Sequence, residues 1–154
     1  MTMNNDQAVD HLQKLLGTVR DGETGFRDAA EHAEAASLKT LFQARSAQRT
    51  KLAAELEAKI TALGSQPRER GSVGAALHRT WLNVRDAVTG RDDYAVVAEA
   101  ERGEDVAISN YQEALNDAAL PADLRDFVQA QYAQVKSSHD EIRDLKHRME
   151  ADKK

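Results

Sequence analysis

The sequence has 154 residues, of which 41% are hydrophobic and 31% charged, and we predict that residues 1–154 fold as one domain. The net charge of −5 argues against a nucleic-acid partner, which needs a basic surface. The chain has no cysteine, which excludes disulfides, thiolate nucleophiles and cysteine-ligated metals. It shows no apolar run long enough to span a bilayer and no secretory signal, so we expect a cytoplasmic protein of bacterial type.

Two long helices are predicted in the first half of the chain, over residues 6–34 and 37–63. In each of them apolar side chains recur every three or four positions, which is the period of an amphipathic helix. Ser37 is a suitable N-cap for the second helix, and Gly64 is a suitable residue to end it. The joint between the two helices is short, so they should pack as antiparallel neighbours.

Two more helices with the same period are predicted in the second half, over residues 92–115 and 121–149. Asp92 places a negative charge at the start of the third helix, and Pro121 suits the first turn of the fourth. β-Branched residues never form an alternating run, so no strand is predicted. The third and fourth helices are joined by a short link and should form a second antiparallel pair.

The long joint between the second and third helices, residues 65–91, is predicted to contain a fifth, shorter helix that begins at Ser72. Its apolar face carries Val73, Leu77, Trp81, Val84 and Val88. A helix of this length spans roughly 24 Å, so the joint can cross from one end of the bundle to the other. We therefore predict an all-α, ferritin-like antiparallel four-helix bundle with one long crossover, in which Trp81 docks the fifth helix. The alternative is that Trp81 binds a partner.

Polar residues interrupt each apolar stripe at the middle of its helix. They are Glu23 in the first helix, Arg45, Gln48 and Arg49 in the second, Glu101 and Glu104 in the third, and Gln131, Ser138 and His139 in the fourth. When the helices are folded at their turns, all of these residues fall within one or two turns of the same height. We therefore predict a buried polar layer halfway along the bundle.

The three carboxylates of this layer need compensation, either from metal ions or from arginine. A ferritin-like di-iron site takes a Glu from each of two helices and Glu-x-x-His from each of the other two. At the expected level the second helix instead has Arg45 and Arg49, and no histidine follows a Glu by three positions. Because guanidinium groups match the two oxygens of a carboxylate, we expect a salt-bridge layer without metal, cofactor or catalytic residue. A non-standard metal or small-ligand site is the alternative.

Three segments of the chain, over residues 21–31, 71–81 and 99–115, resemble a bacterial family of ferritin-like four-helix-bundle proteins classed as a domain of unknown function. They read DGETGFRDAAE, GSVGAALHRTW and EAERGEDVAISNYQEAL, and they follow the order of the family. The resemblance spans nearly the whole chain and implies the ferritin-like fold and a single domain. It implies no activity, and it assigns no role to the glutamates within these segments.

The sequence contains no paired nucleophile and base and no phosphate-binding loop, so we expect a non-catalytic protein that acts through protein association. The expected partner is a second copy of the chain or an unidentified protein. Leu41 and Phe127 lie off the apolar stripes, and they either form a dimer patch or pack against the crossover helix.

Two other functions are kept as alternatives. A divergent carboxylate metal protein would use Glu23, Glu101, Glu104 and His139, with Gln48 or Gln131 as weak neutral ligands. A membrane-surface role for the fifth helix is disfavoured, because its polar face carries few charges.

Overall fold

The computed structural model describes residues 5–69 and 92–152, and four α-helices account for most of them. The helices are α1 (Asn5–His32), α2 (Ala36–Ala62), α5 (Asp93–Leu115) and α6 (Ala122–Asp152). No strand occurs in these two ranges, which confirms the predicted all-α class. None of these four helices is apolar enough over a sufficient length to cross a membrane. The predicted fifth helix, with Trp81, lies outside the described residues.

The turn between α1 and α2 is held by a side chain of α5, and no side chain within the turn caps the start of α2. The prediction that Ser37 caps α2 is wrong, because α2 begins earlier and Ala35 occupies the N-cap position without a side-chain hydrogen bond. The Asp93 carboxylate of α5 instead accepts hydrogen bonds from the backbone N–H groups of Glu34, at 2.8 Å, and Ala35, at 3.1 Å. One acidic side chain therefore ties the α1–α2 turn to the start of α5.

Three other helix ends are set by residues that lie next to them in the sequence. The Asp92 side chain caps α5 by accepting from the backbone N–H of Tyr94 at 3.0 Å. Gly64 follows α2 with φ of 86°, a left-handed conformation that glycine adopts without steric cost. Pro121 precedes α6, and its carbonyl accepts from the N–H of Arg125 at 2.8 Å, so it lies just before the first turn.

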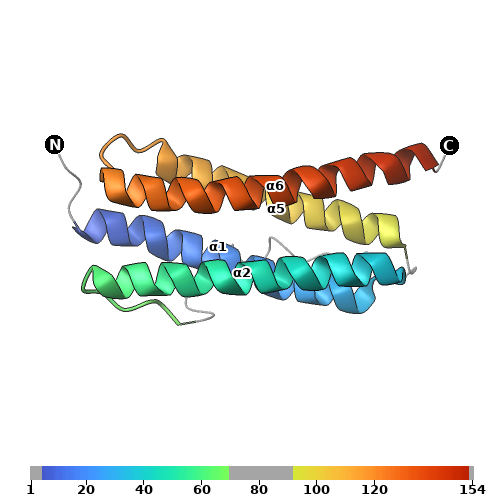
Figure 1. Cartoon of the computed structure of the whole chain (residues 1–154), viewed down its shortest axis with the longest axis horizontal. Helices are drawn as coiled ribbons and strands as arrows, with labels where there is room; N and C mark the ends of the chain where they lie inside the picture. Colours follow the sequence, from blue (N-terminus) through green and yellow to red (C-terminus); the bar gives the residue numbers. More distant parts are fainter. Residues whose placement is uncertain (1–4, 70–91, 153–154) are drawn as a thin grey trace.

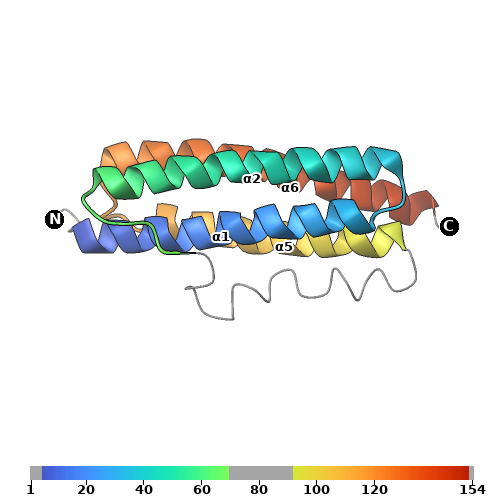
Figure 2. The ribbon, with the colours of Figure 1, turned by 90° about the horizontal axis from the view of Figure 1, so that it is seen from below.

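The four helices stand at the corners of a square in the order α1, α2, α6, α5 (Figures 1 and 2). α1 packs against both α2 and α5, and α5 packs against α6. α2 and α5 run in the same direction, opposite to α1 and α6, and α5 begins at the opposite end of the bundle from the end of α2 (Figure 1). This arrangement confirms the predicted topology, in which the connection from α2 to α5 crosses the length of the bundle.

The apolar core is divided into two clusters, one toward each end of the bundle. The first contains large residues such as Leu12, Leu56 and Val128, and the second contains Phe26 and Phe42. Each such side chain contributes roughly 1.5–3 kcal/mol when it leaves water. Between the clusters every helix presents polar residues, so the predicted interruption of the apolar stripes corresponds to a gap in the core.

Candidate functional site: the mid-bundle polar layer and the α2–α6 groove

The nine predicted layer residues divide into a buried group and a partly exposed group. The buried residues are Glu23, Arg49, Glu104, Gln131 and Ser138, and the partly exposed residues are Arg45, Gln48, Glu101 and His139. The difference arises because residues three or four positions apart on a helix still point up to about 60° apart around its axis. The structure therefore resolves the layer into a central ion pair and several separate networks around it.

The centre of the bundle holds an ion pair between Arg49 of α2 and Glu104 of α5. Nη2 of Arg49 donates to Oε1 of Glu104 at 2.6 Å, and the two residues are 1% and 0% exposed. Nε of Arg49 donates to Oε1 of Gln48 at 3.1 Å, and its guanidinium carbon lies 5.3 Å from the ring centroid of Phe26. Oε2 of Glu104 has no hydrogen-bond partner among the described residues. The negative charge of Glu104 is therefore neutralised by Arg49, which contacts Oε1.

A glycine of α1 makes room for the central arginine. A Cβ atom at Gly22 would lie 3.1 Å from Nη1 of Arg49 and 3.3 Å from its Cγ, which is tighter than ordinary contacts. Glycine in the interior of a helix costs about 1 kcal/mol relative to alanine. Gly22 therefore gives up helix stability so that Arg49 can lie against the α1 backbone.

Glu23 contacts Thr50 and Arg27 at the α1–α2 seam, and among the described residues it forms no ion pair with Arg45 or Arg49. The Thr50 hydroxyl donates to its Oε2, and Arg27 of the same helix forms an ion pair with its Oε1 at 3.4 Å. The expectation that arginines of α2 compensate this acid is wrong, because Arg49 turns toward α5 and is held there by Glu104.

Arg45 and Glu101 also have partners other than those expected. Arg45 forms an ion pair with Glu141 of α6, and burial is the main reason that its pKa is lowered. Glu101 forms an ion pair with Lys146 of α6 at 3.0 Å. Both pairs lie at edges of the bundle, where one partner reaches solvent. An arginine of α2 therefore forms the ion pair with Glu104, as expected, whereas a lysine of α6 forms the ion pair with Glu101.

A second buried network links α5, α6 and α2 beside the central pair. The Tyr111 hydroxyl donates to Oε1 of Gln131 at 2.7 Å, and Nε2 of Gln131 donates to the carbonyl of Leu52 at 3.2 Å and to Glu55 at 3.1 Å. Burial raises the pKa of Tyr111, so its hydroxyl stays protonated and acts as the donor. This chain of hydrogen bonds fixes the height of α6 against both neighbours.

His139 lies at the α5–α6 edge between two carboxylates. Its Nε2 lies 2.6 Å from Asp105 of α5, and its Nδ1 lies 3.0 Å from Asp140 of α6. Burial opposes the charged imidazole, but the hydrogen bonds with Asp140 and Asp105 outweigh it and leave the pKa of His139 raised. The neighbouring residue, Ser138, points to the interior and is 2% exposed.

The residues at the bundle centre do not fit a di-iron centre. Such a centre needs an imidazole from each of two helices and carboxylates that are free to bind metal. At this level α2 presents Arg49 and α6 presents Gln131 and Ser138, while Glu104 is already engaged by a cation. A metal ion at this position would be repelled by the guanidinium group.

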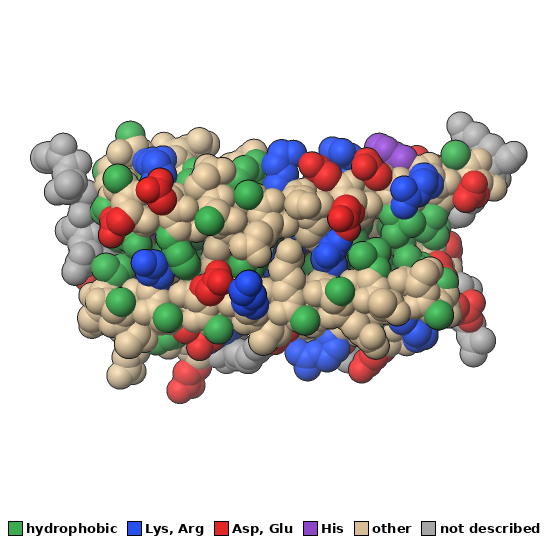
Figure 3. All heavy atoms as spheres, in the orientation of Figure 1, with side chains coloured by type: hydrophobic (Ala, Val, Ile, Leu, Met, Phe, Trp, Pro, Cys, Tyr) green, Lys and Arg blue, Asp and Glu red, His purple; other side chains and the backbone are tan. Residues whose placement is uncertain are grey.

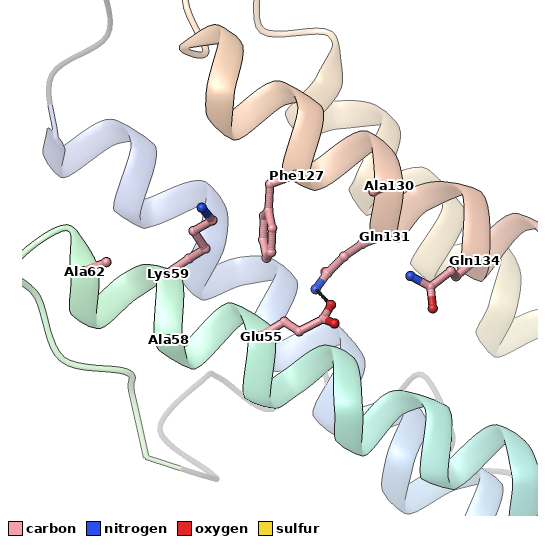
Figure 4. Close-up of a pocket in the computed structure, with 8 residues that line it drawn as sticks. All are labelled: Glu55, Ala58, Lys59, Ala62, Phe127, Ala130, Gln131 and Gln134. Atoms are coloured by element: carbon pink, nitrogen blue, oxygen red, sulfur yellow. Dashed lines mark hydrogen bonds between the residues drawn. The ribbon is translucent and has the colours of Figure 1, made fainter.

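A groove runs between α2 and α6 along one face of the bundle. α2 and α6 approach each other less closely than the other neighbouring helices do. The groove has a volume of about 600 Å³, and hydrophobic side chains show in the seam between the two helices (Figure 3). It is lined by Glu55, Ala58, Lys59 and Ala62 of α2 and by Phe127, Ala130, Gln131 and Gln134 of α6 (Figure 4).

Phe127 is the largest apolar residue of this groove. Its ring projects from α6 toward α2, and Nζ of Lys59 lies 5.2 Å from the ring centroid (Figure 4). Around the ring, Ala58, Ala62 and Ala130 are exposed and leave the helix surfaces open. Leu41, the other apolar residue off the stripes, is partly buried against the second core cluster.

Comparisons with known proteins support the fold and the family. Residues 7–117 match the family model described as "Domain of unknown function (DUF2383)", which confirms the resemblance. The chain is similar to the crystal structure of a two-domain protein from Anabaena variabilis that contains DJ-1/ThiJ/PfpI-like and ferritin-like domains, with a TM-score of 0.76 and 20% identity. That match covers 96% of this chain and 41% of the other, so the present chain spans less than half of that protein. No curated protein matches the chain.

Proposed function

The chain belongs to the family described as a domain of unknown function (DUF2383), and we propose that it is a non-catalytic ferritin-like bundle that acts by association with a second copy of itself through the α2–α6 groove. A cytoplasmic location is part of the proposal. The observation that carries it is the groove itself, an open seam in a bundle whose other helix pairs pack closely. Open apolar surface of this kind is typical of protein interfaces.

The shape of the groove suits a helix from another molecule. Ala58, Ala62 and Ala130 are exposed, and such small side chains allow a second backbone to approach closely. Phe127 adds a large apolar surface at the centre, and aromatic residues are enriched in the cores of interfaces. Gln131 and Gln134 provide polar groups at one end.

The charges on the rim make this surface complementary to itself. Glu55 and Lys59 are one turn apart on α2, so they project from the same side of the helix. A twofold axis passing between them would place Lys59 of one protomer opposite Glu55 of the other protomer. Opposite charges then meet twice in a symmetric dimer, which favours a second copy as the occupant.

The central ion pair supports the non-catalytic part of the proposal. Arg49 and Glu104 occupy the position where a ferritin relative would carry out redox chemistry, and their charges neutralise each other. A carboxylate metal protein with Glu23, Glu101, Glu104 and His139 as ligands needs Glu23 and Glu104 to share one site. Those two acids have separate partners.

The dimer can be tested with a matched pair of substitutions on α2. Ala58→Arg places a long cation in the groove, whereas Ala44→Arg places the same side chain on an exposed position of the same helix, about 21 Å away and outside the groove lining. We expect light scattering to give twice the chain mass of 17.0 kDa for the wild type and for Ala44→Arg. For Ala58→Arg we expect dimerisation to weaken about tenfold or more.

Circular dichroism should show the same helix content for all three proteins, which separates loss of association from loss of folding. A wild-type chain that remains monomeric up to millimolar concentration would overturn the proposal. Equal dimerisation of both variants would also overturn it, because the contact would then lie elsewhere.

A further inference from the structure

Three possible metal ligands meet at the α5–α6 edge, away from the central ion pair. Glu101 and Asp105 come from α5 and His139 comes from α6, and one ligand atom from each lies within 4.8 Å of the others. We propose that these residues bind one divalent first-row transition-metal ion. This inference does not depend on the proposed dimer, because the α2–α6 groove has different lining residues.

The spacing of the ligands follows from the helix geometry. Glu101 and Asp105 are four residues apart, so their carboxylates lie one above the other on the same side of α5. His139 enters from the neighbouring helix. One imidazole with two carboxylates is a donor set that suits Zn²⁺, Fe²⁺ or Mn²⁺, whereas Ca²⁺ and Mg²⁺ prefer oxygen ligands alone.

The histidine is already oriented as a metal-binding histidine would be. Its Nδ1 lies 3.0 Å from the Asp140 carboxylate, which holds the ring and favours Nε2 as the ligand atom. Nε2 lies 2.6 Å from Oδ1 of Asp105. Two ligands bonded to one tetrahedral ion at about 2.1 Å are roughly 3.4 Å apart, so the contact must open by about 0.8 Å to admit the ion.

Solvent access also suits a metal site. Asp105 is exposed over 59% of its side chain and can adjust its rotamer, while His139 and Glu101 are mostly buried, at 15% and 14%, and hold their positions. A site with three protein ligands at an edge leaves coordination positions for water. At this edge His139 contacts Asp105 and Glu101 contacts Lys146, whereas Arg49 is engaged by Glu104 at the bundle centre.

Lys146 competes with the ion for Glu101. Its Nζ lies 3.0 Å from Oε2 of Glu101 and 3.9 Å from Oε1 of Glu150, so it has a second carboxylate to which it can turn. Metal binding therefore exchanges one cation for another at Glu101. Removal of this lysine charge should strengthen binding, because Glu101 then loses its competing cation.

The test is a calorimetric titration of the full chain with Zn²⁺ at a pH of about 8, where proton competition for imidazole is reduced. We expect one ion per chain. His139→Gln should abolish stoichiometric binding, and Asp140→Asn should weaken it by about 10–100-fold through loss of ring orientation. Lys146→Met should tighten it.

His147→Gln is the matched control, because His147 is an exposed histidine on the same helix and outside the cluster. We expect its affinity to equal that of the wild type. Co²⁺ should give the visible absorption of a bound ion in the wild type and in the control, and His139→Gln should lose this absorption.

Unchanged Zn²⁺ binding in His139→Gln, or no stoichiometric binding in the wild type, would overturn the site. Weaker binding in Lys146→Met would also contradict it. The Ala58→Arg variant should retain full Zn²⁺ binding, so failure of the dimer and failure of the metal site can be told apart.

Discussion

Glu104 and Glu101 lie one turn apart on α5, and their surroundings differ sharply. Glu104 is fully buried and paired with Arg49, which is itself 1% exposed. Glu101 lies at the α5–α6 edge and is paired with Lys146, whose side chain is 27% exposed. The small rotation between the two positions therefore separates a sealed ion pair from an exchangeable one.

The comparison shows that the role of a carboxylate in a helical bundle depends on how far its cationic partner is exposed to solvent. A buried pair cannot exchange partners without leaving a charge in the core, and this costs several kcal/mol. The edge pair can exchange its cation at lower cost, because Lys146 is partly exposed and has a second carboxylate, Glu150, to which it can turn. The centre then sets the register of the helices, whereas the edge is available for binding.

The largest effect is expected from removal of the central cation. Arg49→Met leaves Glu104 buried without its partner, so the free energy of unfolding should fall by about 3–5 kcal/mol. Urea denaturation followed by circular dichroism measures it. Arg148→Met, at an exposed position of α6, is the control and should change stability by less than about 0.5 kcal/mol. A loss at Arg49 as small as the control would mean that the centre is not sealed.

Removal of both central charges should restore most of this loss. In the double variant Arg49→Met with Glu104→Leu, no charge is left unpaired, and apolar replacement of a buried ion pair is often neutral or stabilising. The double-mutant cycle should therefore give a strongly non-additive result. Additive losses from the two single variants would show that the residues act independently.

A smaller effect is expected from the hydrogen-bond network beside the pair. Tyr111→Phe leaves Oε1 of the buried Gln131 without its donor, so stability should fall by about 1–2 kcal/mol. Tyr132→Phe is a matched control, because its hydroxyl accepts an exposed bond from Gln112 at 3.1 Å. Equal losses in the two variants would contradict the distinction between centre and edge.

The smallest effect is expected at the arginine one turn from the central one. Arg45→Ala removes an ion pair with Glu141, whose side chain is 59% exposed, so the loss should be about 1 kcal/mol or less. The same urea experiment measures it. A loss as large as that of Arg49→Met would show that Arg45 shares the neutralisation of Glu104.

The sequence predicts the fold well because the apolar period and the turn residues act locally. The stripes predict four helices, and the two short joints with one long joint predict the crossover topology. The interruption of the stripes predicts the height of the polar layer, because helix rise is nearly constant. The prediction that Ser37 caps α2 is wrong because the backbone N–H groups of this turn are bound by Asp93, a residue far along the chain.

The partners within the layer could not be predicted with the same success. Arg45 and Arg49 both lie on the stripe of α2, but only Arg49 reaches Glu104, and the choice depends on helix rotation and on the space beside Gly22. A glycine in the middle of a helix is a signal that could have identified this space. Lys146 and Asp105 lie off the stripes, so periodicity gave no indication that they contact the layer.

The most direct test of the central claim is an anomalous difference map from crystals grown with excess Zn²⁺. We predict that Arg49 contacts Glu104 directly, that no zinc lies between Glu23 and Glu104, and that zinc density lies beside His139. Zinc bound by Glu23 and Glu104, with Arg49 turned into solvent, would contradict it.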